Sequence, residues 1–108
     1  MTPQSAAISL QAMGSDARLS VLRALIRAGE AGLSVGAIQE RTGIAASTLS
    51  HHIRMLSEAG VITQKREGRT IVTHAAYDHL RELADFILSE CCSDQALGTD
   101  QPLHESID

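Results

Sequence analysis

Aromatic side chains are nearly absent from this chain of 108 residues, in which Phe, Trp and Tyr together make up 2%. There is no Trp, and Phe86 and Tyr77 are the single members of their types. Pockets for large flat ligands are usually lined with aromatic residues, so such a pocket is not expected here. The hydrophobic 44% of the chain consists mostly of Leu, Ile, Val and Ala, which suit packed helices in one domain with a small core.

Segments for crossing or entering a membrane are also lacking. No uncharged apolar run approaches the roughly 18 residues of a membrane-spanning helix. The first residues do not combine a basic stretch with an apolar one, as a secretory signal does. The two cysteines, Cys91 and Cys92, are adjacent and do not make a disulfide framework. We therefore expect a cytoplasmic protein with no membrane partner.

The charge of the chain is sorted along the sequence. The net charge of −4 does not by itself suggest a nucleic-acid partner. Residues 15–75, however, hold eight basic and five acidic residues and carry +3, whereas the remainder holds one base and eight acids and carries −7. Such sorting is what electrostatic steering towards a polyanion needs, although a short chain can also show it by chance.

Hydrophobic periodicity predicts two helices in the first third of the chain. Residues 1–14 are weakly amphipathic and indicate a short helix. A stronger helix begins at Ser15, whose hydroxyl can cap it, with Asp16 at its positive end; Gly29 and Gly32 close it. The apolar residues that define the two helices are Ile8, Leu10, Met13, Leu19, Leu22, Leu25 and Ile26.

The next two predicted helices are separated by a glycine turn. Ser34 is the expected N-cap of a helix that carries Ile38, and Gly43 ends this helix at its C′ position. The following helix covers residues 46–59 and stops at Gly60. Its apolar stripe consists of Leu49, Ile53 and Leu56. A short helix, a glycine-containing turn and a longer helix form the outline of a helix-turn-helix, whose second helix enters the major groove of DNA.

After this outline the pattern changes to that of a β-hairpin. Residues 61–65 and 70–74 are rich in Val, Ile and Thr, and residues 66–69 connect them as a turn. Residues 77–92 return to helical periodicity, with an apolar stripe of Leu80, Leu83, Ala84, Ile87, Leu88 and Cys91. The polar segment 93–108 is expected to be a mobile tail. The predicted fold class is mainly α, with four helices, a β-hairpin wing and a final helix.

The second helix of the helix-turn-helix has a small, polar and basic outer face. At about 100° per residue, Ser47, His51 and Arg54 lie opposite the apolar stripe. These groups can bond phosphates or base edges, and the one acid of the helix, Glu58, lies near its far end. The candidate DNA contacts on this helix are Ser47, Thr48, Ser50, His51 and Arg54.

His52 lies beside the buried stripe, and the favoured interpretation is a packed histidine bonded to a neighbouring carbonyl. Adjacent side chains on a helix point about 100° apart, so His51 and His52 do not form a joint metal site.

The hairpin supplies a second set of candidate contacts, Lys65, Arg66 and Arg69, around Gly68 at its tip. We expect these side chains to bind phosphates beside or within the minor groove. An exposed turn can carry the same charges merely to stay soluble. A basic hairpin directly after a helix-turn-helix favours DNA.

Two stretches of the chain closely resemble the ArsR/SmtB family of bacterial repressors. One is GIAASTLSHHI at residues 43–53 with its continuations LSEAGVI and REGR, and the other is SDARLSVL at residues 15–22. The resemblance spans about residues 8–92. It implies a dimeric winged helix-turn-helix repressor that sits on a palindromic operator until an inducer, often a metal or metalloid, releases it.

The resemblance also implies how the chain is divided. Residues 1–14 form an arm for dimerisation, residues 15–75 the winged helix-turn-helix domain, residues 76–92 the C-terminal dimerisation helix, and residues 93–108 the tail. The homodimer pairs through its first and last helices. From the residues alone, the apolar stripe of the last helix already requires a partner.

Several positions depart from the family pattern. Many members carry a Cys-x-Cys pair before the recognition helix, where this chain reads Ser34-Val35-Gly36, so that thiolate site is absent. A zinc-type site on the last helix looks like Asp-x-His, whereas this chain has Asp78-His79-Leu80, which argues against zinc. Ala45 stands where relatives often have a capping Ser, at a cost of roughly 1 kcal/mol of helix stability.

Cys91 and Cys92 are the candidate inducer site, because some members of the family that sense trivalent arsenicals carry adjacent cysteines at this place. Soft thiolates are the expected ligands of such a soft centre. Inorganic arsenite prefers three sulfurs, so the third comes from a partner chain or a small thiol, or the inducer is an organic trivalent arsenical with two open positions. No resident cofactor is expected.

Three physical points count against this site. Cys91 can be a small core residue. In an intact helix the two sulfurs diverge, so they reach one atom only if the helix frays after Ser89. The negative helix end, with Glu90 and Asp94 nearby, should raise the thiol pKa values.

Other functions remain open. The same thiols could serve a redox or reactive-sulfur sensor, in which a bridge between subunits or an adduct is favoured over a strained vicinal disulfide. A ligand-free regulator and a winged-helix module for protein assembly are further alternatives. No nucleophile elbow, phosphate loop or coherent metal cluster is present, so we do not expect an enzyme.

Overall fold

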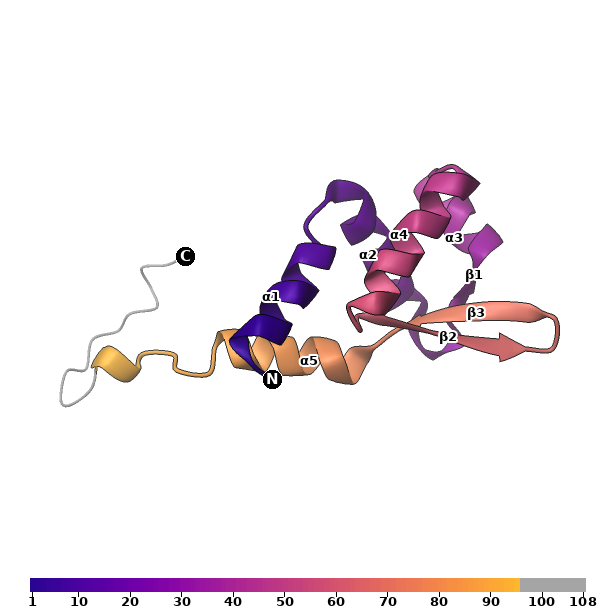
Figure 1. Cartoon of the computed structure of the whole chain (residues 1–108). Coiled ribbons are helices and arrows are strands. Elements are labelled where there is room, and N and C mark those ends of the chain that lie inside the picture. Colours follow the sequence, from indigo (N-terminus) through magenta and orange to yellow (C-terminus); the bar gives the residue numbers. More distant parts are fainter. Residues whose placement is uncertain (96–108) are drawn as a thin grey trace.

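The computed structural model describes residues 1–95 and contains a helical domain with a projecting hairpin and a long C-terminal helix (Figure 1). The predicted tail covers residues 93–108, and its part from residue 96 onward lies outside the described residues. Its first three residues, Ser93–Gln95, form the 3₁₀ turn η2. Within residues 1–95, no helix is both long enough and apolar enough to cross a membrane.

The first two predicted helices are present. Helix α1 covers Pro3–Ala12 and begins with a reciprocal cap between Thr2 and Ser5. Helix α2 covers Asp16–Ala28, and the Ser15 hydroxyl accepts the Arg18 N–H as expected of its N-cap. Of the apolar residues that predict this helix, Leu22 and Leu25 are buried, and Leu19 and Ile26 are exposed.

The helix-turn-helix consists of α3, Val35–Thr42, and α4, Ala46–Glu58. Ser34 caps α3 by accepting the Ala37 N–H, and Gly43 ends it with φ of 75°. A side chain is strained in this left-handed conformation, so glycine is the fitting residue for the turn. Ala45 precedes α4 without any side-chain cap, as the sequence predicts.

The hairpin consists of β2, Ile62–Glu67, and β3, Thr70–Ala75. The strand β2 extends two residues further towards the tip than predicted, whereas β3 begins at Thr70 as predicted. Arg66 therefore lies in β2, and the turn is Gly68 and Arg69 alone. A strand that the sequence analysis missed, β1 at Leu33–Ser34, pairs antiparallel with β3. The sheet therefore has three strands in the order β1-β3-β2. β1 is too short to show a periodicity of its own.

Helix α5 covers Tyr77–Ile87, so the predicted extension of this helix to Cys92 is wrong. The chain leaves the helix at Leu88 and continues in turns up to η2.

One aliphatic core joins α2, α3, α4 and the sheet. Its fully buried side chains include Val21, Leu25, Ile38, Leu49, Leu56, Val61 and Ile62. The predicted stripe of α4 is confirmed, because Leu49, Ile53 and Leu56 are all buried. Burial of this stripe fixes which face of α4 is left in solvent, and so positions the candidate site.

Candidate nucleic-acid interface

Helix α4 presents the five candidate side chains on its solvent face. Ser47, Thr48, Ser50, His51 and Arg54 are all exposed. Within residues 1–95, none of them makes a hydrogen bond or an ion pair to another residue, so their polar groups are available to a ligand. Their exposure is as the sequence predicts, while contact with DNA stays a prediction.

Next to this face lies a shallow groove of about 350 Å³ between α4 and the hairpin. Ser50 and Arg54 line it from α4, and Gln64 lines it from β2. The outer face of α4 is thus continuous with the base of the hairpin. A duplex that contacted one would be held close to the other.

The hairpin carries Lys65, Arg66 and Arg69, and all three are exposed. Lys65 pairs across the ladder with Val72 and Arg66 with Ile71. Because successive side chains of a strand point to opposite faces, Lys65 and Arg66 lie on opposite sides of the wing. The three cations therefore do not form one cluster as the sequence suggested, and Arg69 alone belongs to the turn.

His52 is packed beside the core as expected, but the carbonyl partner is missing. Its Nδ1 is buried and has no hydrogen-bond partner within the described residues. Burial lowers the pKa of His52 below its usual value, and the positive charges of Arg18 and His51 lower this pKa further. His52 is therefore neutral near physiological pH.

Arg18, which the charge count included among the basic residues, has a structural role. Its Nε donates to the Ala12 carbonyl, and its Nη1 lies 3.6 Å from the Met55 sulfur. It joins α1, α2 and α4. One of the eight basic residues counted in residues 15–75 is therefore engaged within the protein and is not free for a partner.

Cys91 and Cys92 lie in the turns after α5, and both are exposed. The interpretation of Cys91 as a core residue is therefore wrong. The two sulfurs are 3.2 Å apart, and Cys92 has a positive φ of 66°. On an intact helix the two sulfurs would point apart, and they could meet only if the helix frayed after Ser89. Because α5 already ends at Ile87, the two cysteines lie outside the helix and this obstacle is absent.

The pKa of the Cys92 thiol is raised above its ordinary value, in the predicted direction. The first cause is its hydrogen bond with Cys91, followed by desolvation and by repulsion from the Cys91 charge. The helix terminus invoked by the sequence analysis is not among these causes.

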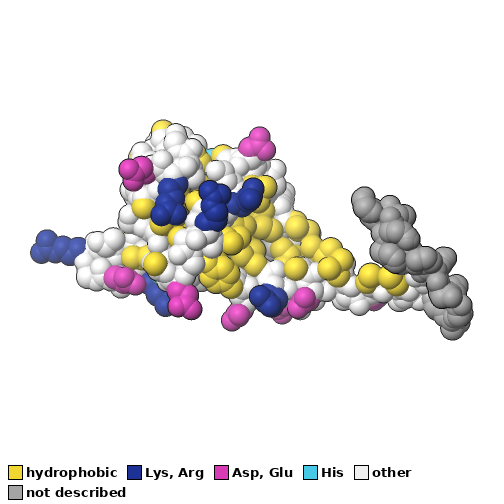
Figure 2. Space-filling model, turned by 180° about the vertical axis from the view of Figure 1, so that it is seen from behind, with side chains coloured by type: hydrophobic (Ala, Val, Ile, Leu, Met, Phe, Trp, Pro, Cys, Tyr) yellow, Lys and Arg dark blue, Asp and Glu magenta, His cyan; other side chains and the backbone are white. Residues whose placement is uncertain are grey.

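Large hydrophobic side chains are exposed on α1, on α2 and at both ends of α5. Ile8, Leu10, Leu19, Ile26, Tyr77, Ile87 and Leu88 are between 39% and 66% exposed. The Tyr77 hydroxyl lies 3.4 and 3.3 Å from the carbonyl oxygens of Leu25 and Ile26, so the start of α5 adjoins the end of α2. Figure 2 shows hydrophobic side chains gathered on this side of the molecule, with Lys and Arg side chains beside them.

Comparison with known proteins agrees with this geometry. Residues 13–65 match the family model described as a helix-turn-helix domain. The HTH-type transcriptional regulator NmtR of Mycobacterium tuberculosis is 38% identical over 80 residues, which cover 73% of this chain and 63% of NmtR. The chain spans about three fifths of the length of the curated relatives that it matches.

Two solved structures are similar in fold. An ArsR-like transcriptional regulator from Rhodococcus sp. RHA1 has a TM-score of 0.72 at 21% identity, with 85% of this chain and 83% of that chain covered. A homodimeric winged helix-turn-helix DNA-binding domain from Mycobacterium bovis has a TM-score of 0.66 at 23% identity, with 91% and 89% covered.

The fold and the matched domain define a winged helix-turn-helix protein, which confirms the predicted fold class. Within that class its fold is similar to that of the ArsR-like regulator from Rhodococcus sp. RHA1.

Proposed function

We propose that this protein is a homodimeric DNA-binding transcriptional repressor that leaves its operator when a trivalent arsenical binds Cys91 and Cys92. The observation that carries the DNA-binding part is the outer face of α4. Five polar side chains are exposed there with no partner within residues 1–95, while the opposite stripe anchors the helix in the core.

Helix α4 is the second helix of a helix-turn-helix, and in that motif the second helix lies in the major groove. Arg54 can bond guanine edges or phosphates, and the serine hydroxyls and His51 can bond base edges or backbone oxygens. The cations of the wing lie beyond the groove that adjoins α4 and extend the contact along the phosphate backbone.

The exposed hydrophobic side chains of α1, α2 and α5 support the homodimer. Soluble monomers rarely leave so many large apolar side chains together in solvent. A second copy of the chain covers this surface and presents two α4 helices at a fixed spacing, as a palindromic operator requires. The homodimeric M. bovis neighbour is consistent with this arrangement.

The 3.2 Å contact between the two sulfurs supports the inducer, because one arsenic atom can bind both. With an organic arsenical that carries two hydroxyl groups, two As–O bonds break and two As–S bonds form. The two thiol protons leave in two molecules of water. The turns that hold the cysteines follow α5 directly, so a bound arsenical reshapes the end of the helix that sets the spacing of the α4 helices.

DNA binding is tested by fluorescence anisotropy with a duplex from the promoter region of its own gene, over a range of salt concentrations. We expect the wild type to bind with strong salt dependence and Arg54→Gln to bind at least about tenfold more weakly. Arg81→Gln removes the same charge at an exposed position of α5, and this variant should bind as the wild type does. If the wild type does not bind the duplex, or binds it independently of salt, the DNA-binding proposal is wrong, and a module for protein assembly is the alternative.

The inducer is tested by adding phenylarsenite or arsenite to the complex of protein and duplex. Wild type should be released, and Cys91→Ser/Cys92→Ser should stay bound. If the arsenical also releases the double variant from the duplex, the cysteine site is wrong. If the wild type stays on the duplex, the protein is a repressor without a thiol-based inducer.

The exposure of both free thiols also favours a second candidate, a redox or reactive-sulfur sensor. When two thiols of different subunits form a disulfide, they lose two electrons and two protons, and hydrogen peroxide takes these up as two molecules of water. The raised pKa of Cys92 slows this reaction, because the thiolate is the reactive form. Mass spectrometry after mild oxidation, with a disulfide-linked dimer or a sulfur adduct as the positive result, separates this sensor from a metalloid sensor.

A further inference from the structure

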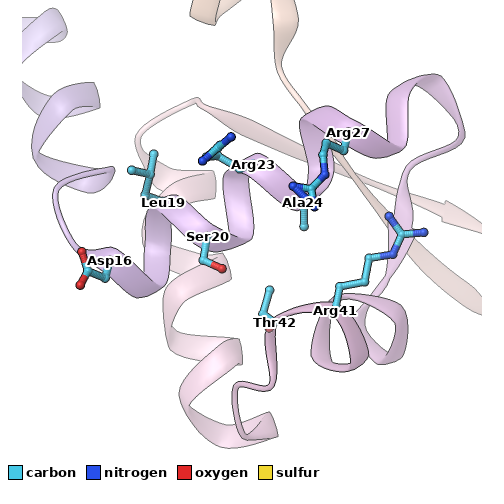
Figure 3. A pocket seen from close by; sticks show the side chains of 8 residues that line it. All are labelled: Asp16, Leu19, Ser20, Arg23, Ala24, Arg27, Arg41 and Thr42. Atoms are coloured by element: carbon cyan, nitrogen blue, oxygen red, sulfur yellow. The ribbon is translucent and has the colours of Figure 1, made fainter.

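A second basic surface lies between α2 and α3, apart from the α4 face and the wing. It is a groove of about 490 Å³ (Figure 3). Arg23 and Arg27 line it from α2, and Arg41 lines it from the last turn of α3. Arg23 and Arg27 are four residues apart, so they lie on the same side of the helix, about 6 Å apart along its axis.

The three guanidinium groups are not neutralised by the protein. Within residues 1–95, no acidic side chain forms an ion pair with Arg23, Arg27 or Arg41, and none of the three makes a hydrogen bond. Asp16 is the acidic residue of the lining, and Figure 3 shows it at the opposite end of the groove from Arg27 and Arg41. Three like charges on one groove repel one another, and a polyanion is the partner that relieves this repulsion.

The position of the groove in the motif indicates which polyanion fits. In a helix-turn-helix the first helix crosses the DNA backbone while the second enters the groove. Arg41 and Thr42 lie in the last turn of that first helix, and α4 begins only a short turn later, at Ala46. The Ser20 hydroxyl, without a partner within residues 1–95, adds a donor from α2.

We propose that the groove between α2 and α3 is a further phosphate-binding surface, on which Arg23, Arg27 and Arg41 contact the backbone of the DNA duplex. The inference rests on the proposed DNA-binding function and extends its footprint beyond α4 and the wing. Because phosphate contacts carry no sequence information, the surface strengthens binding to all duplexes alike.

The test is the salt dependence of duplex binding by Arg23→Gln/Arg27→Gln/Arg41→Gln, measured with promoter DNA and with a mixed-sequence duplex. The three arginines are exposed and glutamine is a good helix former, so the variant should fold. Both subunits of the homodimer carry the three substitutions, so six phosphate contacts are lost. Each lost contact reduces the slope of log K against log salt by about 0.9, so the slope should become shallower by about 5.4 on both duplexes. Between about 50 and about 200 mM salt, the variant should then lose affinity by a factor roughly 1,800 smaller than the wild type does.

Two single variants serve as controls. Arg81→Gln removes one positive charge on α5, outside the groove, and should keep the wild-type slope. Asp16→Asn removes the negative charge of the lining and should bind duplex more tightly than the wild type.

Each outcome is decisive. If the triple variant keeps the wild-type slope while Arg54→Gln weakens binding, the groove proposal is wrong and the proposed function stands. If the triple variant keeps its slope and loses binding of inorganic pyrophosphate that the wild type shows, the groove is a small-anion site instead. If the wild type binds neither duplex, the proposed function fails first.

Discussion

The Oγ of Ser9 and the Nε2 of His79 lie 2.8 Å apart and connect α1 with α5. Ser9 is 1% exposed, and its Oγ also lies 3.4 Å from the carbonyl oxygen of Ala59, the residue that follows α4. These contacts join α1 and α5, two of the three helices of the proposed dimer surface, to the end of α4.

The first prediction concerns this contact. Ser9→Ala leaves the imidazole of His79 without its partner in a partly buried site, and should lower the free energy of unfolding by about 1–3 kcal/mol. Urea denaturation measures the loss. Ser20→Ala, at an exposed position of α2, should change stability by less than about 0.5 kcal/mol. An additive loss in Ser9→Ala/His79→Ala would show that the two side chains are not coupled.

The second prediction concerns pH. The pKa of His52 is lowered in the folded protein, so the unfolded chain binds more protons below its ordinary value of about 6.5. The contribution of neutral His52 to the free energy of unfolding should therefore be fully present above that pH. It should decrease as the pH falls below it, until the pH reaches the lowered pKa of the folded state. His52→Gln should flatten this part of the stability curve, below about pH 6.5, as measured by urea denaturation. His51→Gln removes one of the two charges that lower the pKa of His52, and should flatten the curve less than His52→Gln does.

The third prediction compares Gly36, within α3, with Gly43, the residue that ends α3. Gly43 has φ of 75° with open space around its Cα, so Gly43→Ala should cost about 1 kcal/mol through backbone strain alone. Gly36 lies within the helix, also in open space, so Gly36→Ala should stabilise the protein by about 0.5–1 kcal/mol. Thermal unfolding of both variants gives the comparison. Equal effects would contradict the left-handed turn.

The fourth prediction concerns the start of α4. Ala45 has the extended backbone of an N-cap but no side chain that can accept a hydrogen bond. Ala45→Ser should stabilise the protein by about 1 kcal/mol, because the serine oxygen can accept a free N–H of the first turn. Ala46→Ser, one residue into the helix, is the matched control and should give no gain. Thermal unfolding decides, and a gain from both variants would argue against a cap.

The fifth prediction uses the alternation of the wing. Since Lys65 and Arg66 point to opposite faces of β2, a duplex on one face meets one of them. Lys65→Gln and Arg66→Gln should therefore differ. One should reduce the salt slope of duplex binding by about 2, one contact from each subunit, and the other should leave it unchanged. Equal reductions would mean that both side chains reach phosphates around the tip.

Local signals accounted for most of the fold. The caps Ser15 and Ser34, the turn at Gly43 and the stripe Leu49, Ile53 and Leu56 are all where the sequence places them. Each depends on residues within one helical turn, so it can be read without the tertiary structure. The polar outer face of α4 follows from the same periodicity.

The errors lie where long-range contacts decide. β1 is a strand only because Leu33 and Ser34 meet Thr73 and Val72. The predicted stripe of α5 contains Ile87 and Leu88, which remain exposed, and helical periodicity alone cannot show where the helix ends.

The sequence by itself determined the helix-turn-helix, the hairpin and the charged side chains they carry, because capping, turn formation and amphipathic periodicity are local. Only the tertiary structure decided that Arg41 of α3 joins Arg23 and Arg27 of α2, and that Ser9 contacts His79 across 70 positions of the chain. Contacts between distant segments depend on how helices pack around a shared core, and no local pattern encodes that packing.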